Sequence, residues 1–168
     1  MLSTLKPYWG PHMQLNEDIL RRVQETLEER KNKGPHWKYL MVEVAGQKFG
    51  IPMQQVEEVL ESRRWNELPV NRPHMLGVLN LRSSVIAVYH MASLLGKAAD
   101  AQASAGTGCV IVVHDKDRRF GLWVERMLQV EEFPVEDLHA LNDGQLLVTH
   151  LCVEDNESVL MMDVERVA

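Results

Sequence analysis

Only the first part of this chain has a helical pattern of hydrophobic and polar positions. Four apolar residues recur every four positions and form one stripe, carried by Leu15, Ile19, Val23 and Leu27. Asn16 can cap the start of a helix, and Gly34-Pro35 suits its end. We therefore predict one amphipathic helix in an N-terminal extension, residues 1–36. Its stripe is too narrow for a central helix, so it should pack on the outside of the fold or against a partner.

From Tyr39 onward the pattern changes to the period of two that is typical of β-strands. We predict strands at residues 39–44, 48–51, 77–81, 85–89, 109–114, 119–124, 128–132, 146–153 and 159–162. Residues 53–60 fit either a helix or a short turn followed by a strand. Residues 97–108 are rich in Ala, Ser and Gly, which predicts a flexible surface connection. The fold class is therefore mainly β.

The stretch from residue 75 to residue 95 combines two apolar strands with a polar turn. Arg82-Ser83-Ser84 joins the strands into a hairpin, and a short helical start follows. Gly77 lies inside an apolar run, which predicts a β-bulge or the close approach of another backbone. Arg82 is either solvated at the turn or held by a carboxylate from elsewhere in the chain.

The two halves of the strand-rich region follow one plan. Phe49-Gly50-Ile51 returns as Phe120-Gly121-Leu122, 71 positions later. We also align Val85-Ile86-Ala87-Val88 with Val159-Leu160-Met161-Met162, 74 positions later. Two copies of a small strand unit predict two small barrels or sheets that share a core, because neither copy alone buries enough surface.

Composition limits the classes of partner. The formal net charge of −6 argues against nucleic acid or an anionic membrane, because phosphate binding requires clustered Lys and Arg. No apolar run reaches the roughly 18 residues of a membrane span, and the N-terminus lacks a secretory pattern. We therefore expect no direct membrane insertion. Cys109 and Cys152 lie in apolar strands and should be reduced and buried, which fits a cytoplasmic protein.

Patterns of catalytic or metal-binding residues are weak. The seven histidines show no metal-ligand spacing, and the chain has no glycine-rich phosphate loop. Cys109, His114 and Asp115 could be arranged as nucleophile, base and orienting acid, which keeps a cysteine hydrolase as one alternative. However, alternation along a strand puts Cys109 and His114 on opposite faces. We expect no catalytic residue, no metal and no cofactor.

Several segments, in their order and spacing, resemble the CheW family of chemotaxis coupling proteins. They are Phe49-Gly50-Ile51-Pro52, Val56-Glu57-Glu58-Val59, Gly77-Val78-Leu79-Asn80-Leu81-Arg82, Val85-Ile86-Ala87-Val88 and Phe120-Gly121-Leu122-Trp123-Val124. The resemblance implies two intertwined five-stranded SH3-like β-barrels with an added N-terminal helix. The barrels would occupy residues 37–168, as two similar halves at about 37–96 and 108–168.

The resemblance also implies a function. Members of the family are non-catalytic adaptors that couple the cytoplasmic tip of a methyl-accepting chemoreceptor to a CheA-type histidine kinase in a bacterial chemosensory array. The receptor would lie in an apolar groove, and a kinase domain of the same fold would cover an exposed strand edge. An alternative of another class is an SH3-like barrel that binds a different partner, such as nucleic acid.

The match to the family motif suggests residues for the receptor contact. The receptor-binding set is Val56, Glu58, Gly77, Asn80 and Arg82. Glu58 and Arg82 should form an ion pair that ties the hairpin turn to the neighbouring segment. For Val56, Gly77 and Arg82, a role in hairpin packing alone stays open beside the receptor role.

The kinase-binding set is Leu128, Val130 and Phe133. This hypothesis predicts that these apolar side chains, or Leu40 and Val42 in the first half, lie partly on the surface.

The sequence departs from the family pattern at several positions near the hairpins. Ser83 stands where a Gly is common, Ala87 where a Pro is common and His90 where an Asp is common. In the second half Asp163 keeps the acid, but His150 stands where the repeat would place a Gly. The fold inference survives these changes, whereas the partner surfaces could be altered. A divergent paralogue in a separate array, such as one for surface or pilus-driven motility, fits this pattern.

Overall fold

The computed structural model describes residues 13–32, 34–69, 72–97, 106–141 and 147–167. The chain divides into two compact units, Met1–Pro35 and His36–Ala168. The first contains the predicted helix, α1 (Met13–Asn32), whose apolar side chains Ile19, Leu20, Val23 and Leu27 are about half exposed. No helix among the described residues has the length and apolar character needed to cross a membrane.

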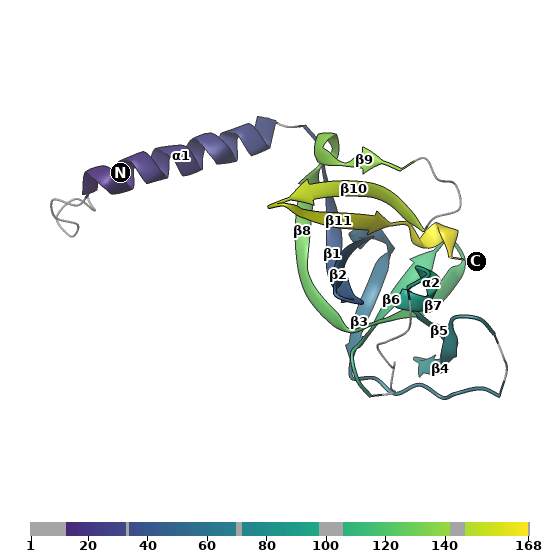
Figure 1. The fold of residues 1–168 in the computed structure, drawn as a ribbon. Helices are drawn as coiled ribbons and strands as arrows, with labels where there is room; N and C mark the ends of the chain where they lie inside the picture. Colours follow the sequence, from purple (N-terminus) through teal and green to yellow (C-terminus); the bar gives the residue numbers. More distant parts are fainter. Residues whose placement is uncertain (1–12, 33, 70–71, 98–105, 142–146, 168) are drawn as a thin grey trace. The chain divides into compact units, whose positions relative to one another are not determined.

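The second unit consists mainly of strands, as predicted (Figure 1). The elements of its first half are β1 (His36–Val44), β2 (Gln47–Pro52), η3 (Met53–Gln55), β3 (Val56–Glu61), β4 (Met75–Leu81), β5 (Ser84–His90) and α2 (Met91–Leu94). Those of its second half are β6 (Cys109–Asp115), β7 (Arg118–Val124), β8 (Arg126–Pro134), η4 (Val135–Asp137), β9 (His139–Ala140), β10 (Val148–Glu154), β11 (Glu157–Met162) and η5 (Val164–Arg166). Residues 53–60 are therefore a short turn followed by a strand. Most of the predicted connection 97–108 lies outside the described residues.

The described strands form two sheets by reciprocal exchange between the halves. Sheet A has the strand order β8-β1-β2-β11-β10-β9, and sheet B has the order β3-β6-β7-β5-β4. Each sheet takes the first hairpin of one half and receives the third strand and second hairpin of the other half. The predicted intertwining is confirmed. Within the described part of the chain, the two edge strands of each sheet are not paired with each other, so the sheets curl without closing.

The parallel pairings fix the internal repeat more finely than the sequence did. In sheet A, Leu160 of β11 lies opposite Phe49 of β2, and in sheet B Ala87 of β5 lies opposite Phe120 of β7. The first hairpins are thus related by 71 positions and the second hairpins by 73. Our alignment of the second hairpins at 74 positions was wrong by one residue. The offset of 73 also superimposes the hairpin turns, which set the register of their strands.

Three hydrophobic clusters support the sheets in the described residues. One lies within sheet A and includes Tyr39, Met41 and Phe133, and one lies within sheet B around Trp65 and Trp123. The third draws on strands of both sheets, so it joins them into one unit.

The prediction of partial exposure is wrong for Leu40, Val42 and Phe133, which are all buried. Leu40 and Val42 belong to the cluster between the sheets, while their neighbours Tyr39 and Met41 belong to the cluster within sheet A. Strand β1 is therefore buried on both faces along this stretch. Phe133 points into the cluster within sheet A, where its ring meets Tyr39 edge to face.

Candidate functional site

Glu58 and Arg82 meet across the two edges of sheet B, as predicted. Glu58 lies on the edge strand β3, and Arg82 follows the opposite edge strand β4. The curl of the sheet brings Arg82 Nη2 to 3.7 Å from Glu58 Oε2. The Arg82 side chain is 80% exposed and that of Glu58 is 23% exposed. The ion pair is therefore a surface pair, and its contribution to stability is at most about 1 kcal/mol.

A second ion pair beside it was not predicted from the sequence. Arg119 of β7 donates from Nε to Glu57 Oε2 at 2.8 Å and from Nη2 to Glu57 Oε1 at 2.5 Å. Its Nη1 also donates to Ser84 Oγ at 3.4 Å, next to the hairpin turn. The hydrogen bond from Arg119 lowers the pKa of the Glu57 carboxyl. Because Glu57 and Arg119 are 62 residues apart, no local spacing in the sequence indicates this bidentate pair.

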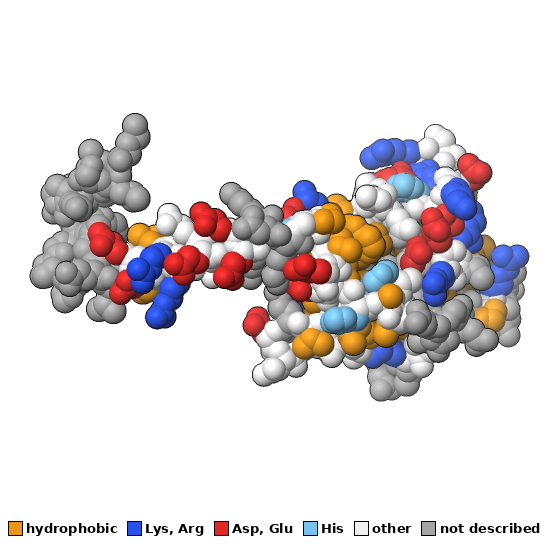
Figure 2. Space-filling view, turned by 90° about the horizontal axis from the view of Figure 1, so that it is seen from above, with side chains coloured by type: hydrophobic (Ala, Val, Ile, Leu, Met, Phe, Trp, Pro, Cys, Tyr) orange, Lys and Arg blue, Asp and Glu red, His pale blue; other side chains and the backbone are white. Residues whose placement is uncertain are grey.

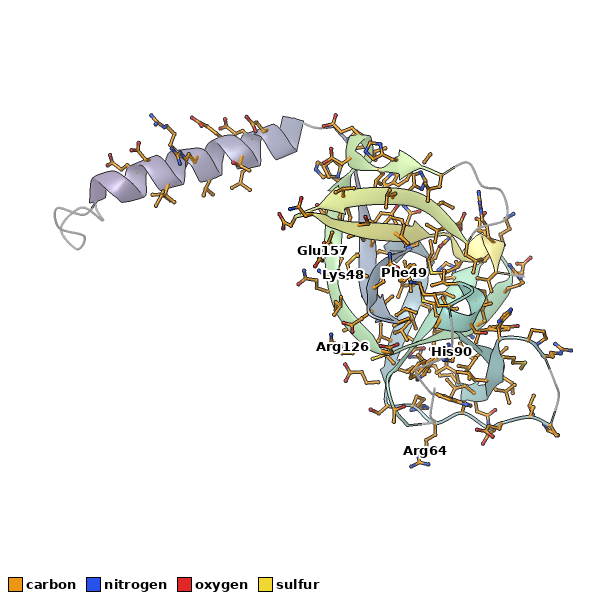
Figure 3. The ribbon with its side chains drawn as sticks, in the orientation of Figure 1. Lys48, Phe49, Arg64, His90, Arg126 and Glu157 are labelled. Atoms are coloured by element: carbon orange, nitrogen blue, oxygen red, sulfur yellow. The ribbon has the colours of Figure 1, made fainter. Side chains whose placement is uncertain are left out.

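The internal repeat places a related pair in sheet A. Lys48 is the counterpart of Arg119, and Glu157 is the counterpart of Ser84. Lys48 Nζ lies 3.3 Å from Glu157 Oε2, and both side chains are labelled in Figure 3. In each sheet, a cation on the second strand of the first hairpin (β2 or β7) thus contacts the first residue after the turn of the second hairpin.

The structure distributes the remaining receptor-set residues over both edges of sheet B. Asn80 is exposed opposite Val85, which is also exposed, and Val56 is half-buried against the cluster between the sheets. Gly77 is buried at a β-bulge, where its Cα lies so close to the Asn66 carbonyl that a Cβ would clash. Both features predicted for Gly77 are confirmed. Any effect of Gly77 on binding must therefore act through the shape of the hairpin.

The turn between β4 and β5 consists of two residues with positive φ. Arg82 has φ 46° and Ser83 has φ 70°. Two left-handed residues in a two-residue hairpin match the right-handed twist of the strands, but glycine or asparagine adopts this conformation at lower cost. Ser83, a non-glycine residue with positive φ, therefore makes this turn strained.

The kinase set lies on β8, an edge strand of sheet A, but its members do not share a face. A β-bulge shifts the register of β8 against β1 between Leu40 and Val42. Leu128 packs against the cluster within sheet A and Phe133 belongs to it, whereas Val130 pairs with Leu40 and is 50% exposed. Val130 is thus the exposed member of the set.

Strand β6 does not bring Cys109 and His114 together as the nucleophile and base of a cysteine hydrolase. Cys109 is buried in the cluster between the sheets, opposite Val124, while His114 lies opposite Arg119 near the other end of the strand. Five residues of strand separate them by about 17 Å. Among the described residues, no group of three or more His, Cys, Asp or Glu could hold a metal ion.

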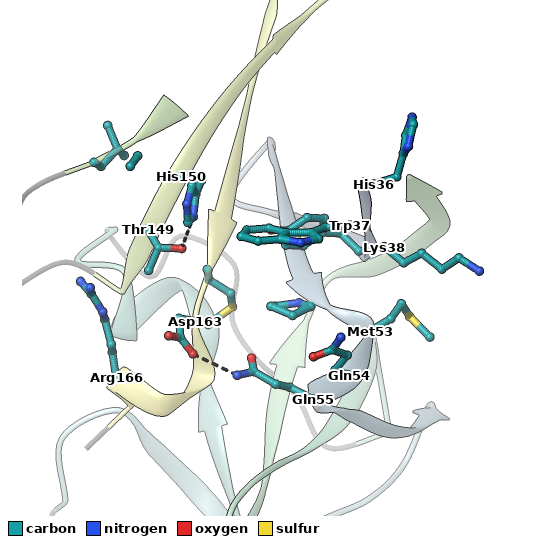
Figure 4. A pocket seen from close by; sticks show the side chains of 15 residues that line it. His36, Trp37, Lys38, Met53, Gln54, Gln55, Thr149, His150, Asp163 and Arg166 are labelled. Carbon is teal, nitrogen blue, oxygen red and sulfur yellow. Dashed lines mark hydrogen bonds between the residues drawn. The ribbon is translucent and has the colours of Figure 1, made fainter. Parts of the chain in front are cut away.

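A groove of about 810 Å³ opens at one end of sheet A (Figure 4). Trp37 and His150 meet edge to face across it, with ring centroids 5.6 Å apart. Gln55 donates to Asp163 Oδ1 at 3.0 Å and accepts from the Val164 N–H at 3.2 Å, which ties η3 to η5 along the groove wall. Figure 2, viewed from above β9 and β10, shows hydrophobic side chains beside histidines on this face. The sequence analysis did not identify this groove.

Comparisons with known proteins agree with the fold. The chain is 26% identical over 131 residues to the chemotaxis protein CheW of Thermotoga maritima, covering 76% of this chain and 85% of the relative. It is 27% identical over 116 residues to protein PilI of Pseudomonas aeruginosa, covering 69% of this chain and 64% of that relative. The crystal structure of the scaffolding protein TtCheW from Thermoanaerobacter tengcongensis matches with a TM-score of 0.68 at 16% identity, covering 77% of this chain and 90% of that one.

The structural match to TtCheW, at 16% identity, shows the fold alone. Membership of a family is shown by a match to a family model. The model of the CheW-like domain matches residues 38–168, which include every strand of sheets A and B apart from the first two residues of β1. The chain therefore belongs to the CheW-like family.

Proposed function

We propose that this chain is a non-catalytic cytoplasmic scaffold that couples a chemoreceptor to a CheA-type histidine kinase. The observation that carries the proposal is the β4–β5 hairpin, which exposes Asn80 and Arg82, and whose Arg82 contacts Glu58 on β3, the strand that begins with the half-buried Val56. The Arg82–Glu58 ion pair links this hairpin to β3, and a hydrogen bond from Arg119 to Ser84 links it to β7, so the surface is preorganised for a partner helix. Similarity to a chemotaxis protein CheW and to a scaffolding protein of the same fold supports this function.

The kinase contact is proposed for the edge strand β8. Its outer backbone groups are unpaired within the described sheet, and exposed edges of this kind are where another strand can add. Val130 contributes exposed apolar surface at this edge. Leu128 and Phe133 would contribute indirectly, because their side chains pack in the cluster within sheet A and hold β8 in place.

A charge reversal tests the receptor surface. We expect Arg82→Glu to weaken binding to a purified chemoreceptor tip from the same genome about tenfold or more, because the cation stands at the centre of the proposed contact. The matched control is Lys116→Glu, since Lys116 is likewise an exposed cation at the first position of a hairpin turn with positive φ. Equal effects of the two variants would contradict the assignment.

A lysine substitution tests the kinase edge. Val130→Lys should reduce affinity for the regulatory domain of the kinase about tenfold, measured by calorimetry, because it places a charge in an apolar contact. Val153, an exposed valine on β10, provides the control substitution Val153→Lys. Unchanged affinity in Val130→Lys, with native circular dichroism, would exclude β8 as the kinase contact.

The behaviour that the scaffold serves is a separate question, because one relative is a chemotaxis protein and the other is PilI. Gene deletion followed by swimming and surface-motility assays tests the two possibilities directly. We expect one of the two motilities to be lost and to return with the wild-type chain but not with Arg82→Glu.

A further inference from the structure

The N-terminal helix α1 lies outside the part of the chain that matches the CheW-like domain, which begins at residue 38. Its apolar side chains Ile19, Leu20, Val23 and Leu27 form one stripe, and each is about half exposed. A helix of 20 residues is only marginally stable in water, and most helices gain stability by burying an apolar face. Within the described residues, the stripe of α1 lacks the contact that would bury it.

The charged residues beside the stripe are arranged as opposites seven positions apart. Seven residues make nearly two helical turns, so residues at this spacing lie on the same side of a helix. Arg22 and Glu29 lie on one side of the stripe, and Arg21 and Glu28 lie on the other. All four side chains are exposed. Each side therefore carries a cation in the middle of the helix and an anion one heptad nearer to its C-terminal end.

An antiparallel pair of α1 helices brings these opposite charges together. Two helices related by a twofold axis present the same side of the stripe to each other when they run antiparallel. With Val23 opposite Leu27 of a second copy, Arg22 of each copy lies within one residue of the level of Glu29 in the other. Arg21 and Glu28 meet in the same way on the other side. A parallel pair in register places cations beside cations and anions beside anions, which is unfavourable.

We propose that α1 joins two copies of this chain as an antiparallel helix pair, with Ile19, Val23 and Leu27 in its apolar seam. Charge complementarity identifies the occupant of the stripe, because the pattern on each side is complementary to itself only when one helix is reversed. A seam of about 30 Å is a small contact, so the dissociation constant should be on the order of 10–100 µM. The proposal concerns α1 alone and does not depend on the receptor and kinase contacts.

Analytical ultracentrifugation of the full chain measures this association. The wild type should pass from monomer to dimer between about 1 µM and 1 mM, whereas the double variant Val23→Ser, Leu27→Ser should stay monomeric. The matched control is the double variant Asp18→Ser, Glu25→Ser, because these exposed residues lie on the opposite face of the helix. It should dimerise like the wild type. A wild type that stays monomeric, or a dimer that survives Val23→Ser, Leu27→Ser, would overturn the proposal.

Exchanging charges tests the antiparallel orientation. Arg22→Glu places two anions at each contact with Glu29, and Glu29→Arg places two cations at each contact with Arg22. Each variant should dimerise about tenfold more weakly at low ionic strength, and the effect should shrink in high salt. An equimolar mixture of the two should form a heterodimer about as tightly as the wild type, because opposite charges face each other again.

The control for the charge exchange is Glu25→Arg, which makes the same change on the opposite face and should alter the dissociation constant less than about twofold. A parallel pair would be strengthened by either Arg22→Glu or Glu29→Arg, so stronger association of the single variants contradicts the proposal. A mixture that associates no better than its separate components does so as well. Since the mixture is compared with those components, the result does not depend on how each substitution affects the helix itself.

Discussion

At the scale of residues, the two equivalent hairpin turns have the same backbone conformation, but their side chains make it more strained in one turn than in the other. The β4–β5 turn uses Arg82 and Ser83 with positive φ, and the equivalent β10–β11 turn uses Asp155 and Asn156. Asparagine visits the left-handed region more readily than serine, because its short side chain can bond the local backbone. The same turn geometry is therefore more strained in the first hairpin than in the second.

Replacing Ser83 by glycine should stabilise the protein. The left-handed conformation costs a non-glycine residue about 1–2 kcal/mol, which glycine avoids. Glycine also gives the unfolded chain more conformational entropy, and this offsets about 0.5–1 kcal/mol of the stabilisation. We expect Ser83→Gly to raise the free energy of unfolding by about 0.5–1 kcal/mol in urea denaturation. Asn156→Gly serves as the control and should gain less. A loss of stability in Ser83→Gly would show that the turn is not strained.

Tyr39 makes the stability of the protein depend on pH in the alkaline range. Burial raises its pKa from the ordinary 10.0 to about 12, so the folded state keeps the neutral phenol while the unfolded state ionises. The stabilising effect is fully present below pH 10 and is lost as the pH rises through about 12. The difference of about two pKa units corresponds to roughly 2–3 kcal/mol. Tyr39→Phe should therefore lose less stability than the wild type between pH 10 and 12, and parallel pH profiles of the two proteins would contradict this.

At the scale of elements, β1 and β8 show why the kinase-contact hypothesis misassigned exposure. The hypothesis predicted that Leu40 and Val42 lie partly on the surface, yet β1 is buried on both faces along this stretch because it lies between two hydrophobic clusters. On β8 a bulge turns Val130 to the face opposite Leu128, so the same strand presents both inward and outward apolar residues. Neither feature is encoded within the strand concerned, because each depends on the partner strand.

The two ion pairs beside the β4–β5 hairpin should contribute unequally. Arg82→Ala should cost at most about 1 kcal/mol, because its pair with Glu58 is exposed and separated by 3.7 Å. Arg119→Ala should lower the denaturation midpoint further, since it removes two short hydrogen bonds to Glu57 and one to Ser84. Urea titrations at pH 7 give this order. A larger loss in Arg82→Ala would show that the Glu58 pair is the stronger restraint.

At the scale of the whole molecule, the reciprocal exchange of strands makes the two halves interdependent. The first hairpin of each half finds its neighbours only in strands of the other half. The cluster between the sheets likewise takes Val42 and Phe49 from one half and Ile111 and Leu122 from the other. A half by itself would leave sheet edges and one face of each cluster in water, which a unit of this size cannot sustain.

Separate expression of the halves tests this interdependence. Residues 1–97 and 106–168, purified as two chains, should each lack a cooperative thermal transition, and mixing them should produce a 1:1 complex with native strand content. Far-UV circular dichroism and analytical ultracentrifugation measure both outcomes. Cooperative unfolding of either half alone would show that the exchange of strands is not what stabilises the unit.

The sequence by itself determined the kind of each element: one amphipathic helix, period-two strands, tight polar hairpins and a duplicated motif that marks the family. These follow from local periodicity and turn chemistry, which short stretches encode. The tertiary structure decided which half each strand pairs with, the burial of Phe133, the contact of Glu57 with Arg119 and the open groove beside Trp37. Such features depend on pairing between distant segments. Alternation assigns a side chain to one of two faces, but only the neighbouring strand determines whether that face meets water or a core.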